Sequence, residues 1–325
     1  MRVLVTGGAG FIGRWVVQRL LEEPEVQSVV VVDDLSSGSL ENIEDLVSAP
    51  AMEMPILGDF GSGQALDSAF MHAPELCLHL AAKINVQRSI DDPWQTFSND
   101  VVSTMRLLLR CRESRTRLVF VSSCMVYDLS ADPISETAPT CCRSPYAGAK
   151  LAAEKMIEGF CHAYGLPCLI LRPFNTYGPF QRCDGEGGVV SVFLERMLSG
   201  SPLLVYGDGT QTRDLLYVED CAEFIVQAGL HGPGDGRVIN AGLGADIRIK
   251  DLAEMISGGT APIRFVDHIH PRSEIARLCS DWSLAEKLLG WRPRVTLEQG
   301  LEKTRRWLED HKQPIGFMEE KIAHG

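Results

Sequence analysis

The 325-residue sequence predicts an α/β fold in which helices cover both faces of a mostly parallel sheet. In the first half of the chain, short apolar runs alternate with amphipathic segments of helical length, which is the pattern of βαβ crossover units. The run Ser28–Asp33 is almost continuously apolar, as expected for a strand that is buried on both faces. Both observations favour a doubly wound parallel sheet over an antiparallel one.

The expected elements follow one another in chain order. Strands are expected at Arg2–Thr6, Ser28–Asp33, Pro55–Leu57, Leu76–Leu80, Leu118–Ser122 and Pro167–Arg172. Amphipathic spacing predicts helices at Ile12–Leu21, Thr96–Cys111 and Tyr146–Tyr164. After residue 174, glycine and proline punctuate the chain more often and the helical segments are shorter. We therefore expect a first domain over 1–174 and a smaller lobe over 175–325, with strands near 214–240 returning to the main sheet.

Composition and charge exclude several classes of partner. A net charge of -12 provides no basic field, so we expect neither nucleic acid nor an anionic membrane surface as a partner. The opening MRVLVT is typical of a strand and not of a signal peptide, and no apolar run reaches the roughly 18 residues of a membrane span. The ten cysteines form no C-x-x-C pair, which favours reduced thiols in a cytoplasmic protein. The stretch Asp267–His270 has metal-binding residue types, but lone loop histidines are more often structural, and we expect no metal.

The first turn, VTGGAGFIG, predicts a dinucleotide site. Gly7, Gly10 and Gly13 follow a strand and open a helix, where glycines allow a tight turn and close approach of the backbone to a pyrophosphate. Asp33 ends the next strand about 20 residues after Gly13, the spacing of a carboxylate that binds ribose hydroxyls. The alternative role for Asp33 is a solvated loop acid. Because no arginine follows it in DDLSSGSLEN to hold a 2′-phosphate, NAD is favoured over NADP.

A second pattern, SPYAGAK, places Tyr146 and Lys150 one helical turn apart. An isolated phenol is a poor base at neutral pH, but a neighbouring ammonium group and a cationic nicotinamide ring both stabilise the phenolate. Ser123 directly follows the expected strand Leu118–Ser122 and is placed to hold a substrate hydroxyl. This spacing also occurs by chance on many helices, so the pair alone is ambiguous.

Together these motifs resemble those of the extended short-chain dehydrogenase/reductase superfamily, in the branch of NAD-dependent nucleotide-sugar epimerases and dehydratases. The matching segments run from Val3 to about Trp307 and include HLAAKINVQRSIDDP, VSSCMVYD, SPYAGAK, LRPFNTYGP and YGDGTQTRDLLYVED. Within the branch, the chain is most similar to 4-epimerases of the UDP-glucose type. The resemblance implies a Rossmann-type sheet with a smaller C-terminal α/β lobe that binds a nucleotide-diphosphate sugar.

The resemblance also implies which residues contact each ligand. The cofactor would contact Gly7, Gly10, Phe11, Ile12, Gly13, Asp33, Asp34, Ser37, Asp59, Phe60, Leu80, Ala81, Ala82, Lys83, Tyr146 and Lys150. The nucleotide sugar would contact Lys83, Ser123, Cys124, Met125, Asn175, Val189, Val205, Arg213 and Arg272. Asn175, Arg213 and Arg272 would meet the diphosphate. Arginine suits that task because its planar fork donates two hydrogen bonds at once, although each arginine alone is also compatible with a surface position.

The pair Cys124-Met125 favours one reaction of the family over the others. In the 4,6-dehydratases these positions are typically Asp-Glu, which remove the C5 proton and protonate the departing C6 hydroxyl, and decarboxylases typically keep the Glu. Met125 cannot transfer a proton, and the Cys124 thiol is a poor substitute for a carboxylic acid. Epimerases need only the Ser, Tyr, Lys and NAD. We therefore expect a 4-epimerase that acts on a UDP-hexose-type substrate through a transient 4-keto sugar, with Ser123, Tyr146 and Lys150 as its catalytic residues.

The sequence leaves alternative functions open and departs from the family pattern at two positions. The alternatives are a 4-ketoreductase, a 4,6-dehydratase whose acid and base come from elsewhere, and, more remotely, a non-catalytic NAD-binding sensor or scaffold. Asp100 stands where relatives usually have Asn, and Asp128 where they usually have a Gly of positive φ. Relatives commonly form homodimers through a four-helix bundle, for which Thr96–Cys111 and Tyr146–Tyr164 are the candidate helices.

Overall fold

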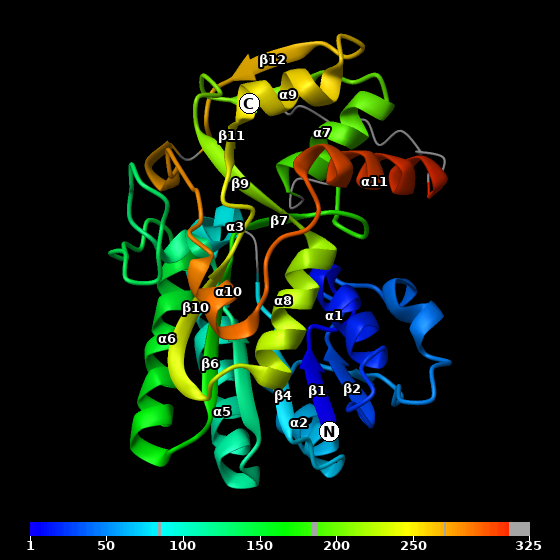
Figure 1. Cartoon of the computed structure of the whole chain (residues 1–325), viewed down its shortest axis with the longest axis vertical. Coiled ribbons are helices and arrows are strands. Elements are labelled where there is room, and N and C mark those ends of the chain that lie inside the picture. Colours follow the sequence, from blue (N-terminus) through cyan, green and yellow to red (C-terminus); the bar gives the residue numbers. More distant parts are fainter. Residues whose placement is uncertain (84–85, 184–187, 270, 312–325) are drawn as a thin grey trace.

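The computed structural model describes residues 1–83, 86–183, 188–269 and 271–311, and it places a smaller lobe above a sheet covered by helices (Figure 1). The strands are β1 (Arg2–Thr6), β2 (Ser28–Asp33), β3 (Ile56–Leu57), β4 (Leu76–His79), β5 (Arg117–Val121), β6 (Cys168–Pro173), β7 (Asn175–Tyr177), β8 (Leu203–Tyr206), β9 (Thr212–Tyr217), β10 (Asp235–Ala241), β11 (Asp246–Arg248) and β12 (Ile263–Val266). The α-helices are α1 (Phe11–Leu21), α2 (Gly63–Met71), α3 (Val86–Asp91), α4 (Pro93–Phe97), α5 (Ser103–Ser114), α6 (Pro145–Tyr164), α7 (Val189–Leu198), α8 (Val218–His231), α9 (Ile249–Ser257), α10 (Ser283–Leu289) and α11 (Leu297–Asp310). Short 3₁₀ helices lie at Leu40–Leu46, Cys124–Val126 and Pro271–Ser273, and a π-helical turn lies at Ser98–Val102.

The central sheet confirms the predicted fold class. Its strand order is β10-β6-β5-β4-β1-β2-β3, and each pair of neighbours runs parallel. The chain leaves β1 first toward β2 and β3, then returns to β4 on the other side of β1. The loops after β1 and β4 therefore diverge and open a crevice at the carboxyl ends of the strands, which is where sheets of this type bind ligands.

Two apolar layers sandwich the sheet because alternate residues of each strand point to opposite faces. On β1, Val3 and Val5 pack with α1, α8 and α10, whereas Leu4 packs with α2, α5 and α6. All three valine and leucine side chains are almost completely buried. The unbroken apolar runs of the sequence thus serve two cores at once, as expected for strands covered on both faces.

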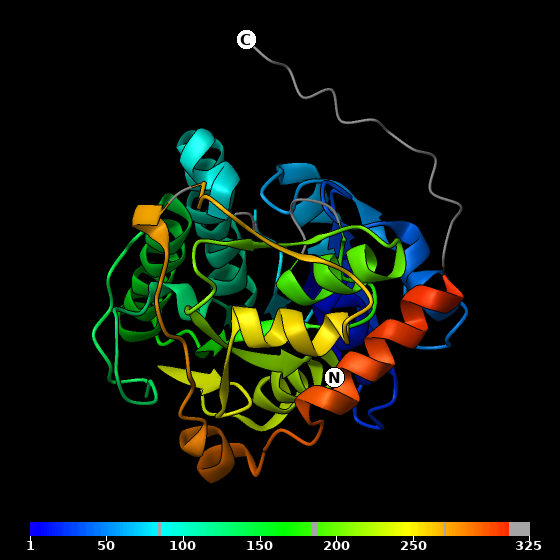
Figure 2. The same cartoon turned by 90° about the horizontal axis from the view of Figure 1, so that it is seen from above.

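The upper lobe has its own small core. A three-stranded sheet, β11-β9-β7, and a two-stranded sheet, β12-β8, pack with α7, α9 and α11. Figure 2 looks down on this lobe and shows α9 and α11 lying across it. Of the strands near 214–240, only β10 joins the main sheet, beside β6, whereas β9 pairs with β7 and β11 in the lobe.

The expected helix over Thr96–Cys111 is interrupted. The chain forms α4, then the π-helical turn Ser98–Val102, and only then the regular helix α5. The amphipathic spacing on each side of the turn is helical, so periodicity alone does not reveal the wider turn between them. Among the described helices, none combines the length and the apolar character that a bilayer-spanning segment requires.

A buried ion pair fixes the ends of β5 and β6 under the cavity described below. Glu154 of α6 accepts hydrogen bonds from the Arg172 guanidinium on β6 and from the Ser122 hydroxyl after β5. Both charged side chains are almost fully buried, and Arg172 also stacks over the Tyr127 ring at 4.6 Å. Ser122 precedes Ser123, so the same network orients the turn that carries a predicted catalytic residue.

Substitution Glu154→Gln is expected to lower the free energy of unfolding by about 3 kcal/mol, because it leaves the Arg172 charge buried without a counter-charge. The matched control is Glu158→Gln, one turn further along α6, where the carboxylate pairs with Lys155 at an exposed site. Urea unfolding of both variants measures the difference. Equal stability of the two variants would show that the buried pair contributes no more than a surface pair.

Candidate functional site

A cavity of about 610 Å³ opens at the carboxyl ends of the central strands, between the sheet and the upper lobe. Its lower wall comes from the loops that follow β1, β2, β4 and β5 and from the start of α6. Its upper wall comes from β7, the start of α7, β9 and the segment Ser273–Ile275. This volume is within the range found for small-molecule and cofactor pockets in proteins.

The glycine turn after β1 forms a cradle that fits a pyrophosphate. Gly7 has a φ of 74°, and a Cβ there would lie 2.8 Å from the Ala81 nitrogen. A Cβ on Gly13 would lie 2.0 Å from the Gly7 carbonyl oxygen, so the turn and α1 pack too closely for any side chain. No side chain caps α1, and the helix N-terminus with its free amides faces the cavity at Gly10. Backbone donors and the positive end of the helix dipole are therefore available to an anion.

The acidic end of β2 lies beside this cradle. Asp33 accepts hydrogen bonds from the backbone nitrogens of Ala9 and Leu35, each at 2.9 Å, which fixes its carboxylate at the cavity wall. Burial raises the pKa of Asp33, and these donors oppose the shift. Across the groove, the Lys83 ammonium donates to the Ser36 hydroxyl at 2.6 Å. The fixed carboxylate matches the hydroxyls of an adenosine ribose and would repel a 2′-phosphate.

Tyr146 and Lys150 lie on the first turns of α6 and both line the cavity. Ser144 caps this helix by accepting from the Ala147 nitrogen, and Pro145 follows at the first helical position. The Lys150 ammonium donates to the Val121 carbonyl at 3.0 Å. These caps and contacts place both side chains against the end of β5, where the substrate would meet the cofactor.

Ser123 comes from the turn after β5 and completes the constellation. Its hydroxyl forms a hydrogen bond with Tyr146 and accepts another from the Met125 nitrogen at 3.2 Å. Burial raises the pKa of Tyr146, and the Ser123 hydrogen bond opposes that shift. Burial lowers the pKa of Lys150, and nearby Asp100 and Glu154 oppose that shift. Without a further positive charge in the cavity, Tyr146 stays a neutral phenol, so its use as a base depends on a cationic ligand.

Cys124 and Met125 form the wall next to Ser123. Both line the cavity, in the 3₁₀ helix Cys124–Val126 that the Ser123 side chain caps. Burial raises the pKa of the Cys124 thiol to about 12, so it stays protonated and takes no part in proton transfer near neutral pH. The thioether of Met125 has no proton to give. This wall therefore offers no acid or base.

The upper wall holds an arginine and its partners. The Arg213 guanidinium forms an ion pair with Glu274 and donates to the carbonyl of Ile275 at 2.8 Å. The Oδ1 atom of Asn175 is buried and has no hydrogen-bond partner within the described part of the chain. His268 hydrogen-bonds to Glu274 at 2.5 Å, so the cluster of charges is held together across β9 and the loop after β12. The Arg213 guanidinium and the Asn175 amide are hydrogen-bonding groups of the kind that bind the diphosphate of a nucleotide.

Comparison with known proteins identifies the family. The family model described as NAD dependent epimerase/dehydratase family matches residues 3–242. The chain belongs to this family. The UDP-glucose 4-epimerase of Mycolicibacterium smegmatis is 37% identical, over 96% of this chain and 100% of the relative. Family membership makes the protein an NAD-dependent enzyme that modifies a sugar nucleotide.

Solved structures of similar proteins agree with this family assignment. Pal from Bacillus thuringiensis superimposes with a TM-score of 0.94 at 48% identity, over 96% of this chain and 100% of Pal. A dTDP-glucose 4,6-dehydratase from Streptomyces venezuelae, solved with NAD and TYD bound, superimposes with a TM-score of 0.88 at 29% identity, over 96% and 98% of the two chains. The family relatives therefore include both epimerases and dehydratases, and the choice between the two reactions depends on the site.

Most of the residues predicted for this family's site lie together around the cavity. Those that line it are Gly7, Gly10, Phe11, Ile12, Gly13, Asp33, Asp34, Ser37, Phe60, Leu80, Ala81, Ala82, Lys83, Ser123, Cys124, Met125, Tyr146, Lys150, Asn175, Val189 and Arg213. They come from two thirds of the chain, and the carboxyl edge of the parallel sheet brings them together.

Three predicted site residues lie away from the cavity wall. Asp59 is exposed and accepts from the Gly61 nitrogen, while its neighbours Gly58 and Phe60 line the cavity. Val205 is fully buried in the core of the lobe, because successive side chains on β8 point to opposite sides and Tyr206 faces the cavity instead. Arg272 is exposed and does not line the cavity, although His268 and Ile269 before it and Ser273 after it do.

Sequence reasoning missed several residues of the wall. They are Gln87, Asn99, Gln181, Tyr206, His268 and Glu274. Tyr206 follows Val205 directly, so a correct strand parity finds it. Glu274 has no comparable local signal, because its role depends on pairing with Arg213 from a strand 61 residues earlier.

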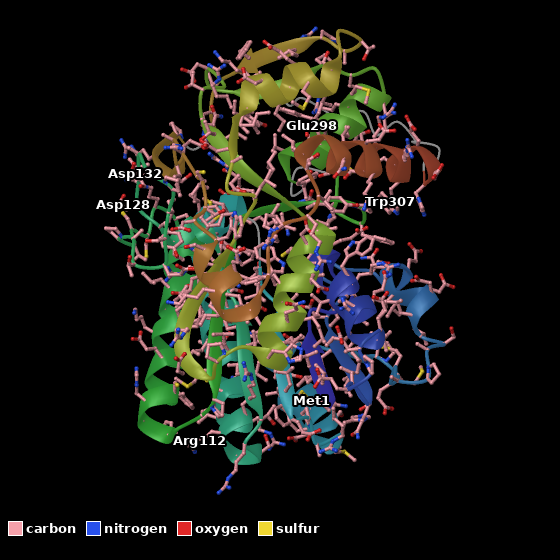
Figure 3. The ribbon with its side chains drawn as sticks, viewed as in Figure 1. Met1, Arg112, Asp128, Asp132, Glu298 and Trp307 are labelled. Carbon is pink, nitrogen blue, oxygen red and sulfur yellow. The ribbon has the colours of Figure 1, made fainter. Side chains whose placement is uncertain are left out.

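Two other expectations concern loops near the site. Asp128 does not adopt a positive φ, so the strain expected for a Gly replacement is absent. Its carboxylate instead accepts from Arg143 at 2.9 Å, and Figure 3 shows it on the outer loop after β5, away from the sheet.

His270 lies outside the described residues, and within the described residues no group of His, Cys, Asp and Glu is arranged to hold a metal.

Proposed function

We propose that this protein is a nucleotide-sugar 4-epimerase that acts on a UDP-hexose-type substrate. The observation that carries the proposal is the distribution of carboxylates around the cavity. Among the described residues of the wall, the carboxylates are Asp33 and Asp34 at the acidic end of β2 and Glu274 in its ion pair with Arg213. None of them lies next to Tyr146, where a dehydratase needs an acid and a base. The name of the Mycolicibacterium smegmatis relative supports the same reaction and the same sugar nucleotide.

The residues of α6 and the β5 turn divide the work as follows. NAD, held by the glycine cradle and Asp33, would supply a reversible hydride acceptor for C4 of the sugar. The Tyr146 oxygen takes the proton of the C4 hydroxyl, and Lys150 stabilises the phenolate by its positive charge. The Ser123 hydroxyl, which already bonds to Tyr146, holds the C4 oxygen in line with that oxygen. After return of the hydride, Tyr146 gives the proton back to the C4 oxygen.

Inversion at C4 requires the 4-keto sugar to turn while the nucleotide stays anchored. Arg213 and Asn175 on the upper wall are the proposed anchors for the diphosphate. Met125 and the neutral Cys124 form the wall against which the sugar turns. Because a flexible thioether offers no fixed hydrogen bond, it does not hold the ketone in one pose.

An isotope experiment tests the reaction. The NAD-loaded protein is incubated with UDP-glucose and dTDP-glucose that carry deuterium at C4, and products are identified by NMR. We expect a C4 epimer that keeps the deuterium at C4, with no label taken up when the same reaction is run in D₂O. This outcome follows because the hydride leaves and returns at one carbon.

A dehydratase gives a different pattern. Its product is a 4-keto-6-deoxy sugar in which the C4 deuterium has moved to C6 and solvent deuterium has entered at C5. Such a product would show that the protein is a dehydratase and would contradict the epimerase proposal. If the protein keeps NAD but converts none of a broader set of sugar nucleotides, the proposal also fails.

We further propose a homodimer in which α5 and α6 of each copy form a four-helix bundle. The two helices pack side by side on one outer face of the sheet, and apolar side chains remain exposed on them, Leu109 on α5 and Tyr164 on α6. Light scattering of the purified protein measures its oligomeric state. A monomer at all concentrations would reject this arrangement.

A further inference from the structure

Asp100 occupies the centre of the π-helical turn between α4 and α5. Its carbonyl accepts from the Thr104 hydroxyl at 2.7 Å, and Thr104 in turn bonds to His79 at 3.0 Å. His79 ends β4 and bonds to Thr6 of β1 at 2.6 Å. A chain of hydrogen bonds therefore locks the turn to the two strands whose loops diverge at the crevice.

The carboxylate of Asp100 is buried and only half satisfied. The side chain is 2% exposed and does not line the cavity. Its Oδ1 atom accepts from the Lys83 nitrogen at 2.9 Å and from Asn99 Nδ2 at 2.8 Å. Its Oδ2 atom is buried with no hydrogen-bond partner in the described part of the chain. A buried oxygen left unpaired is costly, so a role in the site is a better explanation than packing.

Charged groups face Asp100 from two elements. From α6, Lys150 and Tyr146 both interact with it electrostatically, and from the loop after β4 so does Lys83. His79 on β4 is neutral, because burial lowers its pKa to about 3. The packed helix α4 has no ionisable side chain, and on α5 the guanidinium of Arg106 is engaged with the Gly61 carbonyl.

We propose that Asp100 is a positioning residue, a buried carboxylate that sets the pH range in which Tyr146 and Lys150 exchange protons. Burial raises the pKa of Asp100. The charge of Lys150, the two N–H donors and the charge of Lys83 oppose that shift and favour the ionised form. This inference rests on the proposed function, in which Tyr146 is the base. An Asn at this place would keep the hydrogen bonds to Oδ1 but would bring no charge to the pair.

The sign of the effect follows from the charges. Asp100 raises the pKa of Tyr146, because a second negative charge nearby disfavours the phenolate. It also raises the pKa of Lys150, because it favours the ammonium. Activity that needs phenolate and ammonium together is bell-shaped in pH. Removing the carboxylate should therefore move both limbs of the bell to lower pH.

The test is the isosteric variant Asp100→Asn in the full-length, NAD-loaded protein. We expect both limbs of the pH profile of kcat/KM to move down by about one unit. The Tyr146 phenolate can also be followed without turnover, from the ultraviolet difference between each protein and its Tyr146→Phe counterpart during titration. That titration should show the same downward shift. If neither the pH profile of kcat/KM nor the ultraviolet titration shifts, the proposal is wrong.

Controls separate this proposal from misfolding and from failure of the epimerase proposal. Asp128→Asn removes an exposed carboxylate outside the cavity and should leave both limbs in place. Asp100→Ser removes the same charge with a smaller side chain and should also move both limbs to lower pH, which keeps the test open if Asp100→Asn does not fold. The ultraviolet titration needs no substrate. A shift there without any epimerisation would reject the epimerase proposal alone.

Discussion

Replacing Tyr146 by phenylalanine is expected to lower turnover by about 10²–10⁴-fold while NAD stays bound. The substitution removes only the oxygen that takes the proton from the C4 hydroxyl in the proposed mechanism. The ring is buried against the end of β5, and we expect it to keep its place because Ser144 still caps the helix. The Tyr146 nitrogen still donates to the Ser89 hydroxyl at 3.1 Å.

The measurement is single-turnover reduction of the bound NAD together with steady-state epimerisation. Tyr164→Phe is the matched control, because Tyr164 ends the same helix and is exposed far from the cavity. We expect the control to keep full turnover. If Tyr146→Phe also kept it, Tyr146 would not be the base. If the variant lost NAD as well, the change would have disturbed the cavity and the result would contradict the expectation that the ring holds its place.

The sequence predicted well those parts of the protein that depend on local pattern. Each strand from β1 to β6 lies within one residue of its expected start and end. The reason is that a strand buried on both faces must be apolar throughout, and the polar or glycine residues that follow it mark its end. Gly7 and Gly13 were also found from local pattern, because only glycine fits where the turn meets Ala81 and α1, and Gly10 followed from the spacing of the same motif.

Features that depend on distant contacts or on side-chain parity were harder to predict. Val205 and Tyr206 are neighbours on β8, and an error of one residue exchanges the core side for the cavity side. The π-helical turn around Asp100 adds one residue to a helical pattern that otherwise continues. Glu274 becomes part of the site only because the fold pairs it with Arg213. Such pairings are set by tertiary structure and leave no mark in the local sequence.

The Arg213–Glu274 pair supports a second prediction of large effect. Arg213→Ala is expected to raise KM for the sugar nucleotide on the order of 10²-fold or more, because it removes a cation and leaves the Glu274 carboxylate facing the diphosphate. Binding of NAD should not change, since the glycine cradle and Asp33 lie on the opposite wall. Calorimetric titration of the NAD-loaded protein with UDP measures the loss directly.

A double variant and a second arginine make this test specific. Arg213→Ala combined with Glu274→Gln should recover part of the lost affinity, because the repelling charge is then gone while the missing hydrogen bonds are not restored. Arg272→Ala is the matched control: this arginine is exposed outside the cavity, so its loss should change UDP affinity by less than about 3-fold. If Arg272→Ala weakened UDP binding as much as Arg213→Ala, the loop Pro271–Ser273 would have to move over the ligand. The diphosphate would then be held by both arginines, as the family resemblance alone implied.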